Sequence, residues 1–78
     1  MTLTVISSYS TLFTGEADSV TLPGVQGRFT VLNNHAPLIS VLVPGKVTYR
    51  TADGKTGELD IKGGLADVAD NSISVCVY

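Results

Sequence analysis

The 78-residue chain has no tryptophan, one histidine and one cysteine. A lone cysteine excludes a disulfide within the chain and fits a reducing compartment. Zinc-type metal sites need pairs of Cys or His ligands at short spacing, which are absent, and the carboxylates are not clustered. His35 and Cys76 are the only candidates for a base and a thiol nucleophile, and they fall in different kinds of element. We therefore predict no metal site, no cofactor and no catalysis by this chain alone.

Runs of like charge and long apolar runs are also missing. The chain has five Lys and Arg and seven Asp and Glu, which gives a net charge of −2, and these charged residues are dispersed along the sequence. This pattern argues against nucleic acid and against an anionic membrane surface as partners. No stretch approaches the roughly 20 apolar residues of a membrane span, and the first residues do not resemble a signal peptide. We expect no direct membrane insertion, so that any membrane association passes through another protein.

Hydrophobic residues make up 44% of the chain and aromatic residues only 6%, so Val, Leu and Ile must build the core. Apolar and polar residues alternate with a period of two in six runs, which is typical of strands that place one face on a core. The apolar positions of these runs are Leu3 and Val5, Val20 and Leu22, Phe29 and Val31, Val47 and Tyr49, Leu59 and Ile61, and Ile73, Val75 and Val77.

Turn residues separate these runs, and no helical spacing is sustained over more than one turn. The predicted reversals are Pro23-Gly24, Pro44-Gly45, Asp53-Gly54 and Asp70-Asn71. Gly63-Gly64 predicts a bulge or a close approach of another backbone. We predict a single all-β domain over residues 1–78, a flattened β-sandwich or barrel of about ten short, mostly antiparallel strands.

The segment from Gln26 to Leu38 stands out, because a short strand runs into Asn33-Asn34 and then into His35-Ala36-Pro37. Asparagine tolerates left-handed backbone angles, and the residue before a proline is turned away from helix, so we predict a specifically shaped loop. Such a loop in so small a domain is a candidate contact surface. We interpret His35 as fixing this loop by hydrogen bonds to the local backbone, with a pH-sensitive contact as the alternative.

The Gln26–Leu38 segment also resembles the signature of the epsilon subunit of rotary ATP synthases, in which a Gly-x-hydrophobic strand precedes Gly-His-Ala-Pro-Leu. Three further segments resemble the family in the same order along the chain: Leu12–Gly24, Leu42–Val47 and Gly63–Asn71. Two departures are visible. Arg28 stands where relatives often have Glu, and Asn33-Asn34 replaces the usual Pro-Gly.

The resemblance implies a ten-stranded β-sandwich in the rotor stalk. It implies a non-catalytic subunit that links gamma to the membrane c-ring and couples ion flow to ATP synthesis, on the cytoplasmic face of a bacterial inner membrane. Carried over by residue, it implies that the face toward the c-ring comprises Gln26, Gly27, Arg28, His35, Ala36, Pro37 and Leu38.

The family usually continues into a two-helix hairpin, and these 78 residues end at Tyr78, just after the last predicted strand. The 78 residues are either a naturally short epsilon subunit or a piece cut at the domain boundary, and without the hairpin we expect neither nucleotide binding nor a brake on ATP hydrolysis.

A biotinyl or lipoyl carrier domain is the alternative interpretation, since such domains are also small and all-β and present one modified lysine at a hairpin tip. Lys55 lies near such a tip, but Gly54 precedes it, where carriers have Asp or Met. A solvated turn lysine is the simpler interpretation.

Overall fold

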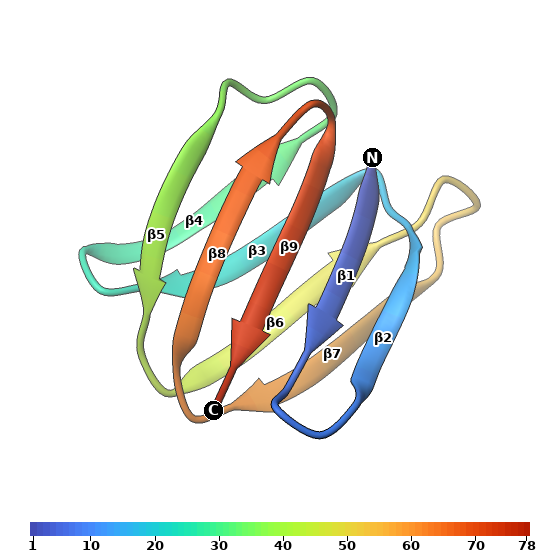
Figure 1. Ribbon diagram of the computed structural model, residues 1–78. Coiled ribbons are helices and arrows are strands. Elements are labelled where there is room, and N and C mark those ends of the chain that lie inside the picture. Colours follow the sequence, from blue (N-terminus) through green and yellow to red (C-terminus); the bar gives the residue numbers. More distant parts are fainter.

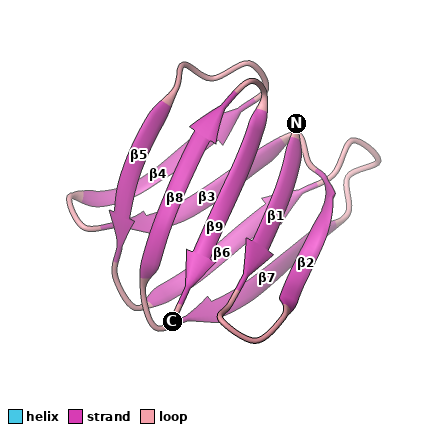
Figure 2. Cartoon of the chain, viewed as in Figure 1, coloured by secondary structure: helices cyan, strands magenta, loops and turns pink.

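The computed structural model describes all residues from 1 to 78 and contains nine strands and no helix (Figures 1 and 2). The all-β class is confirmed, with nine strands in place of the ten that the resemblance implied. The structure contains no helix long and apolar enough to cross a membrane. In chain order the strands are β1 (Thr2–Ile6), β2 (Thr11–Glu16), β3 (Ser19–Gly24), β4 (Gly27–Leu32), β5 (Leu38–Leu42), β6 (Gly45–Arg50), β7 (Thr56–Ile61), β8 (Gly64–Ala69) and β9 (Ser72–Val77).

The strands form two layers, seen one behind the other in Figure 1. The front layer has the order β2-β1-β9-β8-β5, and the rear layer has the order β4-β3-β6-β7. Every pair is antiparallel except β1 with β9. The layers are joined where Gly24 of β3 pairs with Leu42 of β5. This topology agrees with a flattened sandwich.

The core lies between the layers, and the inward positions of all six alternating runs supply most of it. Nine side chains are less than 2% exposed: Leu3, Val5, Val20, Leu22, Val31, Val47, Val68, Ile73 and Val75. Full burial of one such aliphatic side chain contributes roughly 1.5–3 kcal/mol to folding. Alternation therefore predicted correctly which face of each of these strands is buried.

Aromatic side chains close the two flanks where the layers meet solvent. On one flank the rings of Phe13 and Tyr49 lie 4.4 Å apart at an interplanar angle of 35°. On the other flank Phe29 of β4 and Leu38 of β5 are half-buried and pack against the core. This second flank is less completely filled, and the groove described below lies there.

Two of the four predicted turns are displaced. Pro23 and Gly24 end β3, and the reversal is the following pair, Val25-Gln26, because Gly24 and Gly27 face each other as the closing pair of a two-residue hairpin. Similarly, Gly45 already belongs to β6. Pro23 is tolerated within the sheet because β6 pairs with β3 only from Ser19 to Thr21, so no neighbour needs its missing N–H.

The other two turns are confirmed. The Asp53-Gly54 turn joins β6 to β7, with Gly54 at a φ of 85°. Asp70 and Asn71 connect β8 to β9 with φ values of 52° and 56°, the left-handed angles that a tight hairpin requires.

Three strands, β2, β5 and β8, are not among the six alternating runs. In β5 the sequence Leu-Ile-Ser-Val-Leu has apolar residues on both faces. In β8 the outward residue Leu65 is apolar, and the inward positions include the small residues Gly64 and Ala66. The polar outer face that produces alternation is therefore missing from β5 and from this end of β8.

The Gly63-Gly64 pair opens β8, and the predicted close backbone approach is confirmed. A Cβ added at Gly64 would overlap the carbonyl oxygen of Cys76 on β9. Because that oxygen belongs to the backbone of a central strand, no side-chain rotation can relieve the overlap.

We expect Gly64→Ala to lower the free energy of unfolding by about 2–4 kcal/mol, as a rigid overpacking does. Gly54→Ala is the matched control, because Gly54 also has a positive φ but no atom within 4 Å of an added Cβ. Gly54→Ala should lower the free energy of unfolding by only about 1–2 kcal/mol, which is the cost of the left-handed backbone angle for a residue with a Cβ. Denaturant unfolding of both variants checks this, and equal losses would contradict the steric argument.

Candidate partner-binding surface

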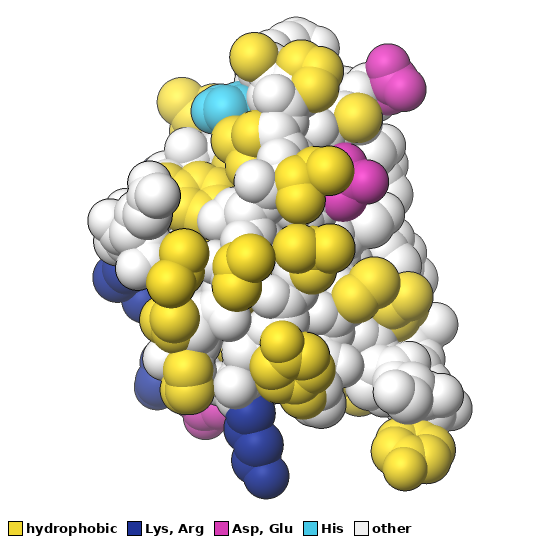
Figure 3. Space-filling model, turned by 60° about the vertical axis from the view of Figure 1, so that its left-hand side comes forward, with side chains coloured by type: hydrophobic (Ala, Val, Ile, Leu, Met, Phe, Trp, Pro, Cys, Tyr) yellow, Lys and Arg dark blue, Asp and Glu magenta, His cyan; other side chains and the backbone are white.

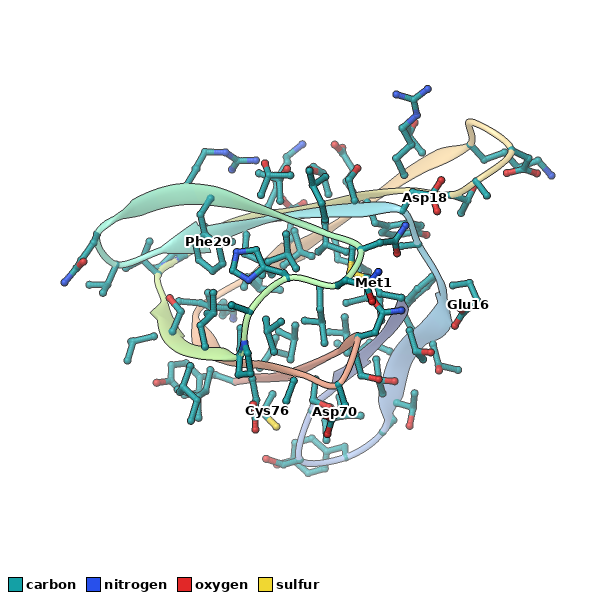
Figure 4. All side chains as sticks on the ribbon, turned by 90° about the horizontal axis from the view of Figure 1, so that it is seen from above. Met1, Glu16, Asp18, Phe29, Asp70 and Cys76 are labelled. Carbon is teal, nitrogen blue, oxygen red and sulfur yellow. The ribbon has the colours of Figure 1, made fainter.

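A groove runs along the flank between the edge strands β4 and β5. It has a volume of about 620 Å³ and is open to solvent. Residues 24–30 form one wall, residues 38–41 form the other, and His35 lies at the end where the β4–β5 loop crosses. Phe29 points from β4 into the space between the layers (Figure 4).

Five of the seven residues predicted for the contact surface line this one groove: Gln26, Gly27, Arg28, His35 and Leu38. Residues 26–28 lie at the β3–β4 hairpin tip, and residues 35–38 lie at the opposite end of β4 (Figure 1). Ala36 and Pro37 are exposed on the connecting loop and do not line the groove. The predicted surface therefore has two ends joined by a groove.

The β4–β5 loop has the local geometry that its sequence predicts. Asn34 adopts a φ of 62°, as expected of a left-handed asparagine. The His35 backbone N–H donates to the carbonyl of Leu32 at 3.2 Å, and the ring Nδ1 donates to the carbonyl of Ala36 at 2.7 Å. A carbonyl can only accept, so this bond places a proton on Nδ1. The interpretation of His35 as a residue that fixes the loop is confirmed.

Contacts distant in sequence anchor the same loop, and local patterns could not have revealed them. The N-terminal ammonium of Met1 donates to Asn33 Oδ1 at 2.7 Å and to the carbonyl of Ala17 at 3.0 Å. The backbone N–H of Asn34 donates to Asn71 Oδ1 at 2.8 Å. Asn33 and Asn34 therefore connect the loop to the start of β1 and to the β8–β9 turn, which holds one end of the groove in place.

An apolar patch adjoins the groove on the outer face of the front layer. We define it by five exposed residues: Val25, Ile39, Val41, Leu65 and Cys76. The first four are 59%, 70%, 51% and 44% exposed. Pairing brings them together, because Val41 faces Leu65, Leu65 faces Cys76, and the Val25 N–H donates to the Val41 carbonyl. Figure 3, which turns the β5 side forward, shows hydrophobic side chains gathered over this face.

Charges are divided between the layers. All five Lys and Arg lie on the rear layer or on the connections at the ends of β7, together with three of the seven carboxylates. The front layer and its remaining connections hold the other four carboxylates and no Lys or Arg. The apolar patch therefore lies on the layer without Lys or Arg. Because the charged residues are dispersed along the sequence, the sequence alone did not show that all Lys and Arg lie away from the front layer.

Lys46 on β6 and Asp53 on the β6–β7 turn have shifted pKa values, and both groups are exposed. The hydrogen bond from Lys46 Nζ to Glu58 Oε1 (3.0 Å) and the charges of Glu58 and Asp60 raise the pKa of Lys46. A hydrogen bond from the Thr51 hydroxyl lowers the pKa of Asp53. Neither group lines the groove, so these pKa shifts belong to the solvent-exposed surface and not to the candidate site.

The side chains near the groove form no catalytic arrangement. No group of three or more His, Cys, Asp or Glu could hold a metal ion. Cys76 points outward from β9 (Figure 4), whereas His35 uses Nδ1 to hold its own loop. Lys55, the residue on which the carrier alternative rests, extends into solvent at the β6–β7 turn, 3.8 Å from Asp53 Oδ2. The geometry suits binding by shape and apolar contact.

Comparisons with known proteins agree with this fold. Among curated proteins, the chain is 48% identical over 65 residues to the ATP synthase epsilon chain of Caulobacter vibrioides, covering 82% of this chain and 73% of that protein. It is 41% identical over 71 residues to the ATP synthase epsilon chain of Rhodopseudomonas palustris (strain BisB18), covering 91% of this chain and 52% of that protein. The chain thus spans about half the length of that relative.

Chains in two solved structures superpose on this fold. A chain in the cryo-EM structure of the Euglena gracilis mitochondrial ATP synthase, OSCP/F1/c-ring, superposes with a TM-score of 0.89 at 25% identity, covering 96% of this chain and 48% of that chain. A chain from the central stalk and c-ring of the Tetrahymena thermophila enzyme shares the fold, with a TM-score of 0.80 at 20% identity, covering 97% of this chain and 61% of that chain. Residues 1–78 match the family described as "ATP synthase, Delta/Epsilon chain, beta-sandwich domain". The chain therefore belongs to the β-sandwich domain family of ATP synthase delta/epsilon chains.

Proposed function

We propose that this domain is a non-catalytic rotor part of an ATP synthase, linking the gamma subunit to the c-ring and so coupling ion flow to ATP synthesis. The observation that carries the proposal is the apolar patch beside the groove, on a chain of the epsilon family. Contiguous exposed apolar surface on a soluble domain marks a protein-binding site. The named bacterial relatives support a place on the cytoplasmic side of a bacterial membrane, and the mitochondrial F1/c-ring structure supports a place within such an assembly.

The apolar patch and the predicted contact surface suit two different partners. The five residues of the apolar patch are uncharged, and one exposed carboxylate, Asp67, lies beside them opposite Ile39. This surface suits a permanent, largely apolar contact, which we assign to gamma. The hairpin tip around Gln26, Gly27 and Arg28 is polar and exposed, and we assign it to the polar loops of the c-ring. The loop residues His35, Ala36, Pro37 and Leu38 lie at the other end of the groove, and we assign them to the c-ring face as well, as the family resemblance implies.

The carrier-domain alternative gains no support from the family match. It requires a covalent adduct on Lys55, so the intact mass of the protein from its native source would reveal it. A biotin- or lipoate-sized increment on Lys55 would overturn the rotor proposal.

We expect Val41→Asp to weaken binding of the chain to its gamma subunit by at least about 100-fold, because the carboxylate would be buried without a counter-ion. Thr14→Asp is the matched control, since Thr14 is exposed on β2, the other edge of the same layer. It should bind as the unchanged chain does. Titration with purified gamma gives the affinities, and thermal unfolding should place both variants within about 1 kcal/mol of the parent. Equal affinities of the two variants for gamma would show that the apolar patch is not part of the interface.

Reversing the charge of Arg28 tests the second contact. Its guanidinium is exposed, forms no ion pair within the chain and lies 3.5 Å from the Lys46 carbonyl. A rim ion pair contributes about 0–1 kcal/mol and acts mainly on register and specificity. We expect Arg28→Glu to weaken docking of the gamma complex on the c-ring while stability changes by no more than about 0.5 kcal/mol.

Sedimentation of reconstituted complexes measures that docking, and Lys55→Glu serves as the matched charge reversal on the distant β6–β7 turn. Unchanged assembly with Arg28→Glu would show that the hairpin tip does not face the ring. A large fall in melting temperature would show instead that Arg28 has a structural role.

A further inference from the structure

The β5 wall of the groove presents backbone groups that no other part of the fold uses. The Val25 N–H donates to the Val41 carbonyl at 2.9 Å, so the carbonyl of Val41 points away from β8. In an antiparallel pair the N–H and C=O of one residue point to the same side, and residues two apart share that side. The N–H and C=O of Ile39 therefore also point away from β8, into the groove, and no loop or turn hydrogen bond engages them.

The β4 wall has the same property. The His35 N–H donates to the Leu32 carbonyl at 3.2 Å, which shows that Leu32 directs its backbone groups away from β3. By the same alternation, Thr30 and Arg28 do so as well. The groove is thus bounded by two open strand edges.

Among the edge strands, β5 has the least protection against pairing with another chain. Natural proteins block open edges with charges, prolines or bulges. Glu16 lies on β2, Arg28 on β4, and both Glu58 and Asp60 on β7. The β5 strand is five residues long and has no charge and no proline. A strand of this kind, with Ile39 and Val41 exposed on its outer face, is expected to be covered in the working protein.

We propose that an extended segment of the partner that covers the apolar patch enters the groove and pairs with β5 as an added strand. This inference rests on the proposed function, which takes that partner to be gamma. Strand addition uses main-chain hydrogen bonds for affinity and alternate side chains for specificity. The free N–H and C=O of Ile39 supply such bonds, and the adjoining patch continues the contact.

The groove also indicates the chemistry of that segment. The Arg28 guanidinium lies over β6, 3.5 Å from the Lys46 carbonyl, and no Lys, Asp or Glu lines the walls. A charged side chain inserted there would lose its hydration without gaining a counter-ion. Phe29 and Leu38 form the inner surface. The occupant is therefore an uncharged stretch whose apolar side chains face these two residues.

A proline at position 39 tests the proposal, because it removes an N–H that the isolated fold does not use. Ile39→Ala is the first control, since it removes the side chain and keeps the N–H. Thr14→Pro is the second control. The Ala17 N–H donates to the Met1 carbonyl, so the backbone groups of residues 17, 15 and 13 point toward β1 and the N–H of Thr14 points away from it, into solvent. We expect Ile39→Pro to bind purified gamma at least 10-fold more weakly than Ile39→Ala. Thr14→Pro should bind as the parent does.

Amide hydrogen exchange of the parent chain gives a readout that does not depend on how the variants fold. The Ile39 amide should exchange rapidly in the free chain and at least 100-fold more slowly in the complex with gamma, with a downfield shift of its proton signal. If Ile39→Pro and Ile39→Ala bind equally and the Ile39 amide stays fast, strand addition is overturned while the patch contact stands. If the parent chain itself does not bind gamma, the proposed function fails, and this inference fails with it.

Discussion

Two backbone hydrogen bonds, from Val25 N–H to the Val41 carbonyl and from Val43 N–H to the Pro23 carbonyl, tie the two layers together at 2.9 Å each. They flank the single pair, Gly24 with Leu42, that connects β3 to β5. Beyond this point β4 continues along β3 and β5 continues along β8, so the two strands diverge and their facing edges stay unpaired. The groove, its open edges and the position of Val25 beside the apolar patch all depend on this one junction.

The junction in turn depends on the two glycines of the β3–β4 hairpin. A Cβ at Gly24 would lie 2.8 Å from the Gly27 carbonyl oxygen and 2.9 Å from the Phe29 ring, and Gly27 has a φ of 127°. The absence of side chains at these positions lets the hairpin close and lets the Phe29 ring pack against its base. A small domain with a thin core can thus keep a hollow flank, because the backbone holds the hairpin where side chains do not fill the space.

The distribution of polarity fits the two contacts that we propose for this small domain. All the Lys and Arg lie on the rear layer or on the connections at the ends of β7, whereas the β5 end of the front layer is largely apolar, with Asp67 opposite Ile39 as its one charge. Apolar surface favours a lasting, largely dry contact, and an exposed charge such as Arg28 acts on register and on the rate of encounter. These two kinds of surface meet at the β3–β4 hairpin, where Val25 belongs to the patch and Arg28 to the tip.

The sequence by itself determined the all-β class, the buried face of six strands and the left-handed asparagine of the β4–β5 loop, because these follow from interactions within a few residues. It also indicated the family, since four segments resemble it in order. The turns at Pro23 and Pro44 were misplaced, because the pairing of Gly24 with Gly27 and of Gly45 with Ile61 decides which residue ends a strand. Alternation missed β2, β5 and β8, and in β5 and at the Leu65 end of β8 the reason is an apolar outer face, so that part of the failure occurred at the proposed interface. Only the tertiary structure decided that Gln26 and Leu38 border one groove, that Asn34 reaches Asn71, and that dispersed charges lie on separate layers. Each of these depends on contacts between residues far apart in the chain, which local patterns do not encode.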